Sequence, residues 1–264
     1  SCALLGFPGA RFYPPLTTRR TILMATGTAL VTGASAGIGA ATVRALRKDG
    51  WTVHMTARRA GRLEVLAAET GAIARAIDAT DEPTMRALVE TTPFDLIVAN
   101  AGRGGAMTGL TGTPPSEIAE VIHLNVTSVL QLIEAALPGM AGRSRGHIIT
   151  LGSVAGLYPL GATLYGATKH AVRGMVRNLR LETLGQGIRF TDIQPGRART
   201  EFYDVAIKDE EERRPIVETG LEQLTPEDVA EAIRWAAAQP DHVNIATIEI
   251  TPRNQVYGGA KNFF

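Results

Sequence analysis

Short apolar runs alternate with longer stretches of helical periodicity along most of the chain. The runs predict strands at residues 28–31, 51–57, 72–78, 94–100, 146–151 and 188–194. Their nearly continuous apolar character is typical of strands that are covered on both faces. The intervening stretches predict helices at residues 59–69, 82–89, 115–140 and 163–184. Because strands and helices alternate, the pattern predicts a parallel sheet with helices on both sides.

The C-terminal part of the chain continues this alternation. Thr225-Pro226-Glu227-Asp228 predicts the start of a last helix, because Thr225 can cap it, Pro226 fits its first turn and Asp228 can return the capping bond. A final strand is expected after this helix. The 264 residues, 45% of them apolar, suffice for one large core. We therefore expect a single doubly wound Rossmann domain over residues 24–264, with about seven parallel strands.

Residues 1–23 differ in character from the sequence that follows. Their apolar stretch is short and is broken by Pro8, Pro14 and Pro15, so it fits neither a secretory signal nor a membrane-spanning helix. We expect an N-terminal extension or an added leader that ends before Met24. An arm that packs on a neighbouring subunit is the alternative.

A glycine-rich turn joins the first predicted strand to a helical pattern. The segment Thr32-Gly33-Ala34-Ser35-Ala36-Gly37-Ile38-Gly39 has the order of strand, loop and helix that a dinucleotide site requires. Gly33 permits a tight turn, Gly37 lets the backbone approach a pyrophosphate, and Gly39 lets the helix pack closely on the strand. Its glycine spacing is not that of the common G-x-G-x-x-G fingerprint, so the turn alone is weak evidence.

Tyr165 and Lys169 lie four residues apart and follow Ser153, which stands just past the predicted strand at 146–151. Positions i and i+4 share one helix face, so the Lys169 ammonium is expected to approach the Tyr165 phenol and lower its pKa. Such a phenol can act as a general acid or base, and Ser153 can orient the reacting oxygen. The alternative is that a tyrosine and a lysine occur at this spacing by chance. The glycine-rich turn is an independent signal that makes this alternative less attractive.

Together these motifs resemble the short-chain dehydrogenase/reductase family, over about residues 28–250. They stand in the family's order and spacing: TGASAGIG, ANAG at 99–102, Asn125, Ser153, the Tyr165/Lys169 pair and Pro195-Gly196. Ala99 is a departure, because many members carry a second asparagine there. The resemblance implies that Asn125 anchors a water beside Lys169, and that Lys169 also holds the nicotinamide ribose. A helix-kink role is the alternative for Asn125, and an ordinary strand-ending turn for Pro195-Gly196.

The resemblance also implies a set of cofactor-binding residues. They are Gly33, Ser35, Ala36, Gly37, Ile38, Gly39, Arg58, Arg59, Asp78, Ala79, Asn100, Ala101, Gly102, Tyr165, Lys169, Pro195 and Gly196. At the end of the second predicted strand, Arg58 and Arg59 replace the acid that would bind the ribose of NAD(H). Guanidinium groups can grip a 2′-phosphate, so we expect NADP(H). The alternatives are solvated charges for the arginines and a helix cap for Asp78.

The substrate is less well defined than the cofactor. Arg103, Tyr158 and Phe202 are candidate substrate contacts besides Ser153, and the charged run 208–214 predicts a solvated lid helix. Surface arginines are common, so Arg103 can equally be an ordinary exposed residue. RTEFYDVAI and HVNIATIEITPRNQVY resemble the branch of the family that contains NADP-dependent serine and 3-hydroxy acid dehydrogenases. That resemblance implies a small polar hydroxy acid or aldehyde as substrate, and a homotetramer.

Composition excludes several other classes of protein. The net charge of +1 comes without a dense basic tract, so neither nucleic acid nor a membrane is expected as a partner. The single cysteine, Cys2, cannot form an internal disulfide, and the five histidines show no metal-ligand spacing. We therefore expect a metal-free, cytoplasmic protein.

The predicted function is an NADP(H)-dependent oxidoreductase that interconverts a carbonyl and an alcohol, with Tyr165 as general acid or base. Three alternatives stay open at this point. The substrate can be a bulkier 3-oxoacyl, cyclic or steroid-like ketone. The protein can be a sensor that only holds the dinucleotide, although it would not need Ser153, Tyr165 and Lys169. An epimerase or dehydratase on a related fold is the third.

Overall fold

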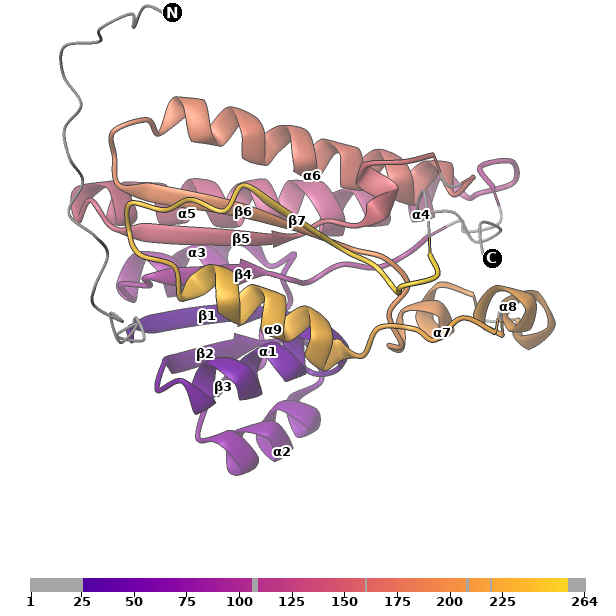
Figure 1. Ribbon diagram of the computed structural model, residues 1–264, viewed down its shortest axis with the longest axis horizontal. Helices are drawn as coiled ribbons and strands as arrows, with labels where there is room; N and C mark the ends of the chain where they lie inside the picture. The colour runs from indigo at the N-terminus through magenta and orange to yellow at the C-terminus, as the bar shows by residue number, and fades with distance from the viewer. Residues whose placement is uncertain (1–25, 106–108, 160, 208, 219, 256–264) are drawn as a thin grey trace, which may run out of the picture.

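Seven parallel strands form one sheet in the order β3-β2-β1-β4-β5-β6-β7 (Figure 1). The computed structural model describes residues 26–105, 109–159, 161–207, 209–218 and 220–255. The strands are β1 (Thr28–Thr32), β2 (Thr52–Thr56), β3 (Ile73–Arg75), β4 (Leu96–Ala99), β5 (Gly146–Leu151), β6 (Ile188–Pro195) and β7 (Thr247–Ile250). This confirms the predicted doubly wound α/β fold.

Helices cover both faces of the sheet. The α-helices of the described chain are α1 (Gly37–Lys48), α2 (Ala60–Thr70), α3 (Glu82–Thr91), α4 (Pro115–Ile122), α5 (Ser128–Gly142), α6 (Thr163–Glu182), α7 (Phe202–Ala206), α8 (Glu210–Val217) and α9 (Pro226–Ala237). Figure 1 shows α1 beside α9, and α7 and α8 beyond the carboxyl ends of the strands. The last helix begins as predicted, because Thr225 and Asp228 form a capping box.

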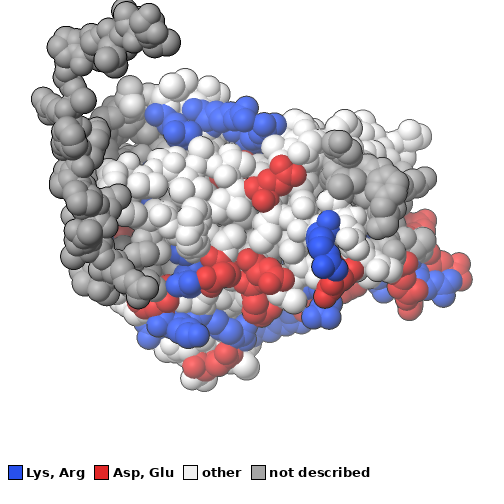
Figure 2. Space-filling view, viewed as in Figure 1, with Lys and Arg blue, Asp and Glu red and all other residues white. Residues whose placement is uncertain are grey.

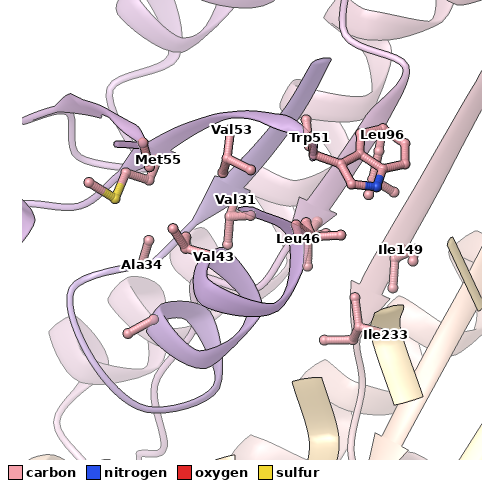
Figure 3. Close-up of a cluster of buried hydrophobic side chains, with 14 of the residues drawn as sticks. Val31, Ala34, Val43, Leu46, Trp51, Val53, Met55, Leu96, Ile149 and Ile233 are labelled. Carbon is pink, nitrogen blue, oxygen red and sulfur yellow. The ribbon is translucent and has the colours of Figure 1, made fainter. Parts of the chain in front are cut away.

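Each face of the sheet has its own core. Beneath α1, α2 and α9, side chains from these helices meet those of β1, β2 and β4, among them Val43, Leu46, Ile233, Val31 and Val53 (Figure 3). On the other face, α3, α5 and α6 pack around Ile97, Ile148 and Phe190. Burying each of these side chains stabilises the fold by roughly 1.5–3 kcal/mol. The two cores hold the strand ends in place, and the candidate site lies there.

The predicted helix at 115–140 is present as one helical stretch, Pro115–Gly142. Its middle part, between α4 and α5, is a π-helical segment, η1 (His123–Thr127), which contains the buried Asn125. The whole stretch Pro115–Gly142 is long and apolar enough to cross a membrane by length and composition. Leu132, Ile133 and Met140 of α5 pack in the core of the domain, so the apolar character of this stretch is that of a core helix.

In the view of Figure 2, acidic and basic side chains are interspersed along the lower part of the surface, a basic group lies at the top, and the area between them is largely uncharged. The lid segment predicted at 208–214 overlaps α8 (Glu210–Val217), which Asp209 caps by accepting from the backbone N–H groups of Glu211 and Glu212. The predicted extension at residues 1–23 lies outside the described part of the chain.

Candidate active site

A cleft of about 530 Å³ opens at the C-terminal edge of the sheet. It lies where the chain order reverses, since β1 is flanked by β2 on one side and β4 on the other. Open parallel sheets bind ligands at such a position. The volume is within the range of cofactor and substrate sites.

The glycine-rich turn after β1 forms one wall of the cleft. Gly33 and Gly37 have φ angles of +66° and +53°, in the left-handed region that favours glycine. A Cβ at Gly39 would lie 2.5 Å from the carbonyl oxygen of Gly33. The roles predicted for Gly33 and Gly39, a tight turn and close helix packing, therefore match the geometry.

The side chain of Asn100 ties this turn to the end of β4. Its Nδ2 donates to the carbonyl oxygens of Thr32 and Gly33, at 2.8 and 3.2 Å. The Thr32 hydroxyl accepts from the backbone N–H groups of Asn100 and Ala101, at 3.1 and 3.0 Å. The preceding residue, at the position of the expected second asparagine, is Ala99, the buried last residue of β4. Asn100 is therefore the single asparagine that holds the turn.

The first turn of α1 borders the cleft with its N-terminus open. The N-cap residue, Ala36, makes no side-chain capping bond, and the first turn contains no acidic residue. Its N–H groups and the partial positive charge of the helix end therefore suit an anion such as a pyrophosphate.

A cluster of charged side chains lies at the end of the cleft that follows β2. Arg59 donates from Nε to the Ser35 hydroxyl at 3.0 Å and from Nη1 to Glu201 at 2.8 Å. Arg62 contacts the same carboxylate at 2.6 Å. Arg58 is 77% exposed, and its described ion pair is a 3.8 Å contact with Asp78. The Arg58 guanidinium is thus the more available of the two predicted phosphate ligands.

Asp78 and Ala79 both line the cleft. The alternative reading of Asp78 as a helix cap is wrong, because α3 is capped by Asp81, whose side chain accepts from the Thr84 N–H. Asp78 instead accepts from the backbone and hydroxyl of Thr80, both at 2.9 Å. These bonds fix its carboxylate at the rim of the cleft.

Tyr165 and Lys169 line the inner end of the cleft, and Ser153 directly follows Gly152, which also lines it. Ser153, Tyr165 and Lys169 are 8%, 9% and 7% exposed. Lys169 Nζ donates to the Leu151 carbonyl at 2.6 Å and lies 5.6 Å from the centroid of the Tyr165 ring. The Ser153 hydroxyl acts on the Tyr165 phenol and favours a lower pKa for it. Helix α6 therefore presents both residues on one face, as their spacing predicts.

Burial dominates the electrostatics of this group. It raises the pKa of the Tyr165 phenol, and the Ser153 hydroxyl opposes that shift without cancelling it. The expectation that Lys169 brings the Tyr165 pKa below its usual value is therefore wrong here. Burial also lowers the pKa of Lys169 to about 8, against the attraction of Asp192. Near neutral pH the phenol keeps its proton and most of the lysine is an ammonium ion.

Asn125 connects the π-helical segment to two other elements. Its Oδ1 accepts from the Arg103 N–H at 2.9 Å, and its Nδ2 donates to the Arg103 carbonyl at 2.8 Å and to the Thr168 hydroxyl at 3.1 Å. The alternative that Asn125 is a helix-kink residue is partly right, since Asn125 lies in the π segment, but its hydrogen bonds are not local. They join the loop after β4 to α6, next to Lys169.

An aromatic side chain packs against Tyr165. The Phe202 ring, at the start of α7, lies 5.1 Å from the Tyr165 ring and 5.3 Å from the Tyr203 ring. A Cβ at Gly104 would lie 2.8 Å from the Phe202 ring, so the loop after β4 meets this ring closely. Phe202 is thus placed where a substrate contact was predicted.

Two other predicted substrate contacts have partners within the protein. Arg103 borders the cleft but pairs with Glu120 at 3.0 Å and Glu117 at 3.9 Å. Tyr158 does not border the cleft. Its hydroxyl donates to Glu249 on β7 at 3.1 Å.

Most of the predicted cofactor residues line the cleft directly. They are Gly33, Ser35, Ala36, Gly37, Ile38, Gly39, Arg58, Arg59, Asp78, Ala79, Asn100, Ala101, Gly102, Tyr165, Lys169 and Pro195. Gly196 lies behind it and donates its N–H to the Ile250 carbonyl at 2.7 Å. Within the described ranges, no group of three or more His, Cys, Asp or Glu side chains is placed to hold a metal ion.

Several residues at the site have no clear signal in the sequence. Thr200 and Glu201 line the cleft, and Glu201 reaches Arg59 across 142 positions of chain. Asp192 and Gln194 lie directly behind Ser153 and read in sequence as part of a strand. Thr32 is the exception among these residues. It ends an apolar run just before the glycines, so its hydroxyl could have been predicted to bond to the backbone of the turn.

The family assignment follows from this site and from comparison with known proteins. The family model described as short chain dehydrogenase matches residues 27–211. The chain belongs to this family.

The similar proteins include dehydrogenases that act on small hydroxy acids. Serine 3-dehydrogenase of Rhizobium radiobacter is 37% identical over 241 residues, which cover 88% of this chain and 96% of the relative. NADP-dependent 3-hydroxy acid dehydrogenase YdfG of Escherichia coli strain K12 is 37% identical over 240 residues, covering 87% and 96%. The solved closed form of serine dehydrogenase complexed with NADP+ has a TM-score of 0.83 and 36% identity, covering 87% of this chain and 96% of that one.

Proposed function

We propose that this protein is an NADP(H)-dependent oxidoreductase that interconverts a carbonyl group and an alcohol. The observation that carries the proposal is that the buried Tyr165 and Lys169 line the inner end of a cleft whose other wall is a glycine-rich turn, with Ser153 next to the lining residue Gly152. A protein that only bound the dinucleotide would not need a buried phenol beside a buried ammonium group.

The residues of the cleft fit the parts of NADP(H). The turn from Gly33 to Gly39 and the open end of α1 suit the pyrophosphate, and Arg58 with Arg59 suits the 2′-phosphate. When bound, the nicotinamide accepts or donates a hydride. Lys169 and Pro195 border the part of the cleft nearest Tyr165.

Proton transfer falls to Tyr165. In the direction of carbonyl reduction, its hydroxyl gives a proton to the substrate oxygen, which carries the developing negative charge. The raised pKa of Tyr165 keeps this proton in place near neutral pH. The Ser153 hydroxyl donates to the same oxygen and orients it. The Lys169 ammonium, 5.6 Å from the Tyr165 ring, stabilises the phenolate left by the transfer.

A small polar hydroxy acid or the corresponding aldehyde is the substrate class that we propose. Two observations support it. Relatives with 36–37% identity act on serine and on 3-hydroxy acids, and the Phe202 ring packs over Tyr165, which leaves limited room at the reacting group.

We propose a homotetramer in the cytoplasm for the assembled protein. Large apolar side chains are exposed on α4 and α5 and near the C-terminal end of α6, including Ile122, Leu130, Leu181 and Leu184. Such side chains suit helix pairing across a dyad. Sedimentation equilibrium would return four times the mass of one chain, whereas a single-chain mass would contradict the assembly.

Cofactor turnover against a panel of substrates tests the proposal. Oxidation of serine and 3-hydroxy acids with NADP+, reduction of small aldehydes, and reduction of bulky cyclic ketones with NADPH would be followed by nicotinamide absorbance, each repeated with NAD(H). We expect turnover with the small polar compounds and preference for NADP(H). Faster turnover of bulky ketones would contradict the substrate class, and absence of turnover on the whole panel would contradict the enzyme.

A further inference from the structure

A buried carboxylate lies directly behind the reacting group. Asp192 on β6 is 1% exposed, yet none of the ion pairs within 4.0 Å in the described chain involves it. Its Oδ1 accepts from the Thr150 hydroxyl at 3.0 Å, and its Oδ2 accepts from the side-chain amide of Gln194. Burying an ionised carboxylate at this depth costs free energy. Its neighbours must therefore compensate for the charge, or the charge must serve the site.

The carboxylate determines which way the Gln194 amide points. An ionised carboxylate can only accept, so it binds the NH₂ group of Gln194 and not its oxygen. The amide oxygen then faces the other way, where Oε1 accepts the backbone N–H of Ser153 at 2.9 Å. Turning the amide over would set two acceptors against each other at Asp192 and two donors against each other at Ser153.

The chain makes room for this contact at Gly152. A Cβ at that position would lie 2.5 Å from Gln194 Nε2 and 2.6 Å from Asp192 Oδ1. The backbone on the N-terminal side of Ser153 therefore rests directly on the two side chains. On its other side, the Ser153 hydroxyl accepts from the Ala155 N–H at 3.1 Å and opposes the effect of burial on the Tyr165 pKa.

We propose that Asp192 is a positioning residue, whose carboxylate fixes the Gln194 amide and thereby holds the Ser153 main chain so that the Ser153 hydroxyl meets Tyr165. The inference rests on the proposed function, since it concerns the placement of the same serine. Burial raises the pKa of the Asp192 carboxyl, whereas the bonds from Thr150 and Gln194 and the positive charges of Lys169 and Arg173 on α6 favour its ionised form. That form is the one that orients Gln194.

Four variants separate this hydrogen-bond path from a general structural role. Asp192→Leu removes the acceptor, and Gln194→Met removes the amide at nearly constant length. Asp192→Asn keeps an acceptor for Gln194, because the Thr150 hydroxyl can turn and accept from the new amide. Thr191→Val is the matched control, since Thr191 is also fully buried on β6 but bonds to His147 and Ile245.

Turnover, NADPH affinity and hydrogen exchange of the Ser153 amide would be measured on each variant. We expect Asp192→Leu and Gln194→Met each to lower kcat by about 10-fold to 100-fold, as a misplaced serine would, with NADPH affinity changed less than about 2-fold and faster exchange at Ser153. The double variant should lose no more than either single one. Asp192→Asn and Thr191→Val should keep kcat within about 3-fold and leave Ser153 exchange unchanged.

Three outcomes would overturn the proposal. They are unchanged exchange at Ser153 in Asp192→Leu, additive losses in the double variant, and equal losses in Asp192→Asn and Asp192→Leu, which would assign the effect to charge acting on Lys169. If the unmodified protein turned over nothing, the proposed function would fail, and the exchange data alone would still decide the role of Asp192.

Discussion

The two ends of the cleft are built on opposite physical principles. At the reacting end, Ser153, Tyr165 and Lys169 are each less than 10% exposed. At the phosphate end, the side chains of Arg58, Arg59 and Glu201 are 77%, 45% and 44% exposed. The reacting end is shielded from water, whereas the charged side chains of the phosphate end are in contact with water.

This difference sets the size of effect expected from each end. Burial changes the pKa of both Tyr165 and Lys169, and a buried group that is removed cannot be replaced by solvent. Exposed ion pairs contribute little individually and are screened by salt. Changes at the reacting end should therefore abolish chemistry, whereas changes at the phosphate end should shift cofactor affinity in steps.

The largest effect is expected for Lys169→Met. Turnover should fall by about 10²-fold to 10⁴-fold, because the charge that stabilises the Tyr165 phenolate is lost. Stability should rise by on the order of 1–3 kcal/mol at pH 7, because burial holds the Lys169 pKa at about 8 against its usual 10.5. That penalty is complete below pH 8 and is relieved as the pH rises toward 10.5, so the gain should shrink over this interval.

Thermal melts at pH 7 and pH 9.5, together with kcat, check this prediction. Lys48→Met, on the C-terminal turn of α1, is the matched control and should change neither quantity. A Lys169→Met protein that is less stable at pH 7 than the unmodified one would show that burial of the ammonium group carries no cost.

The next largest effect is expected for Gly39→Ala. The added methyl group would lie 2.5 Å from the Gly33 carbonyl oxygen, so the turn must move, at a cost of about 1–3 kcal/mol. NADPH binding should weaken by about 10-fold to 100-fold in a fluorescence titration. Gly61→Ala is the control, since nothing lies within 4 Å of its Cβ; it should leave affinity unchanged and stabilise α2. Equal affinities in the two variants would sink the prediction.

A smaller effect is expected for Arg58→Ala. Loss of an exposed charge-assisted bond should raise the Kd for NADPH by about 10-fold and leave the Kd for NADH unchanged. Arg180→Ala, on the last turn of α6, should affect neither. If both dinucleotides weakened equally, Arg58 would not be a ligand of the 2′-phosphate.

Salt should have the smallest effect. Raising the ionic strength from about 0.01 M to 1 M shortens the screening length from about 30 Å to 3 Å. We expect the Kd for NADPH to rise by about 3-fold to 10-fold, while kcat at saturating cofactor stays constant because the reacting end is buried. A kcat that falls in parallel with affinity would remove the distinction between the two ends.

The fold could be read from the sequence because its signals are local. Buried parallel strands appear as apolar runs, and the capping residues of α9 are contiguous in the chain. The π-helical segment at 123–127 could not be predicted, since it depends on Asn125 bonding to Arg103 and Thr168. Those partners are distant in sequence and adjacent only in the folded chain.

The site could be predicted as far as short motifs carry it. The glycine turn and the Tyr165/Lys169 spacing each follow from backbone geometry, so both were located correctly. The predicted direction of the Tyr165 pKa shift is wrong, because the spacing of Tyr165 and Lys169 indicates a neighbouring charge but not how deeply the phenol is buried. The pairing of Glu201 with Arg59 and the place of Asp192 behind Ser153 arise from tertiary packing alone.

The Tyr165→Phe variant tests the central claim most directly, with NADPH affinity and turnover measured on the same preparation. The phenyl ring keeps the contact with Phe202 and removes only the hydroxyl. We expect the Kd for NADPH to stay within about 3-fold and turnover to fall by at least about 10²-fold. Turnover equal to that of the unmodified protein would contradict the account, because the proton would then come from another group.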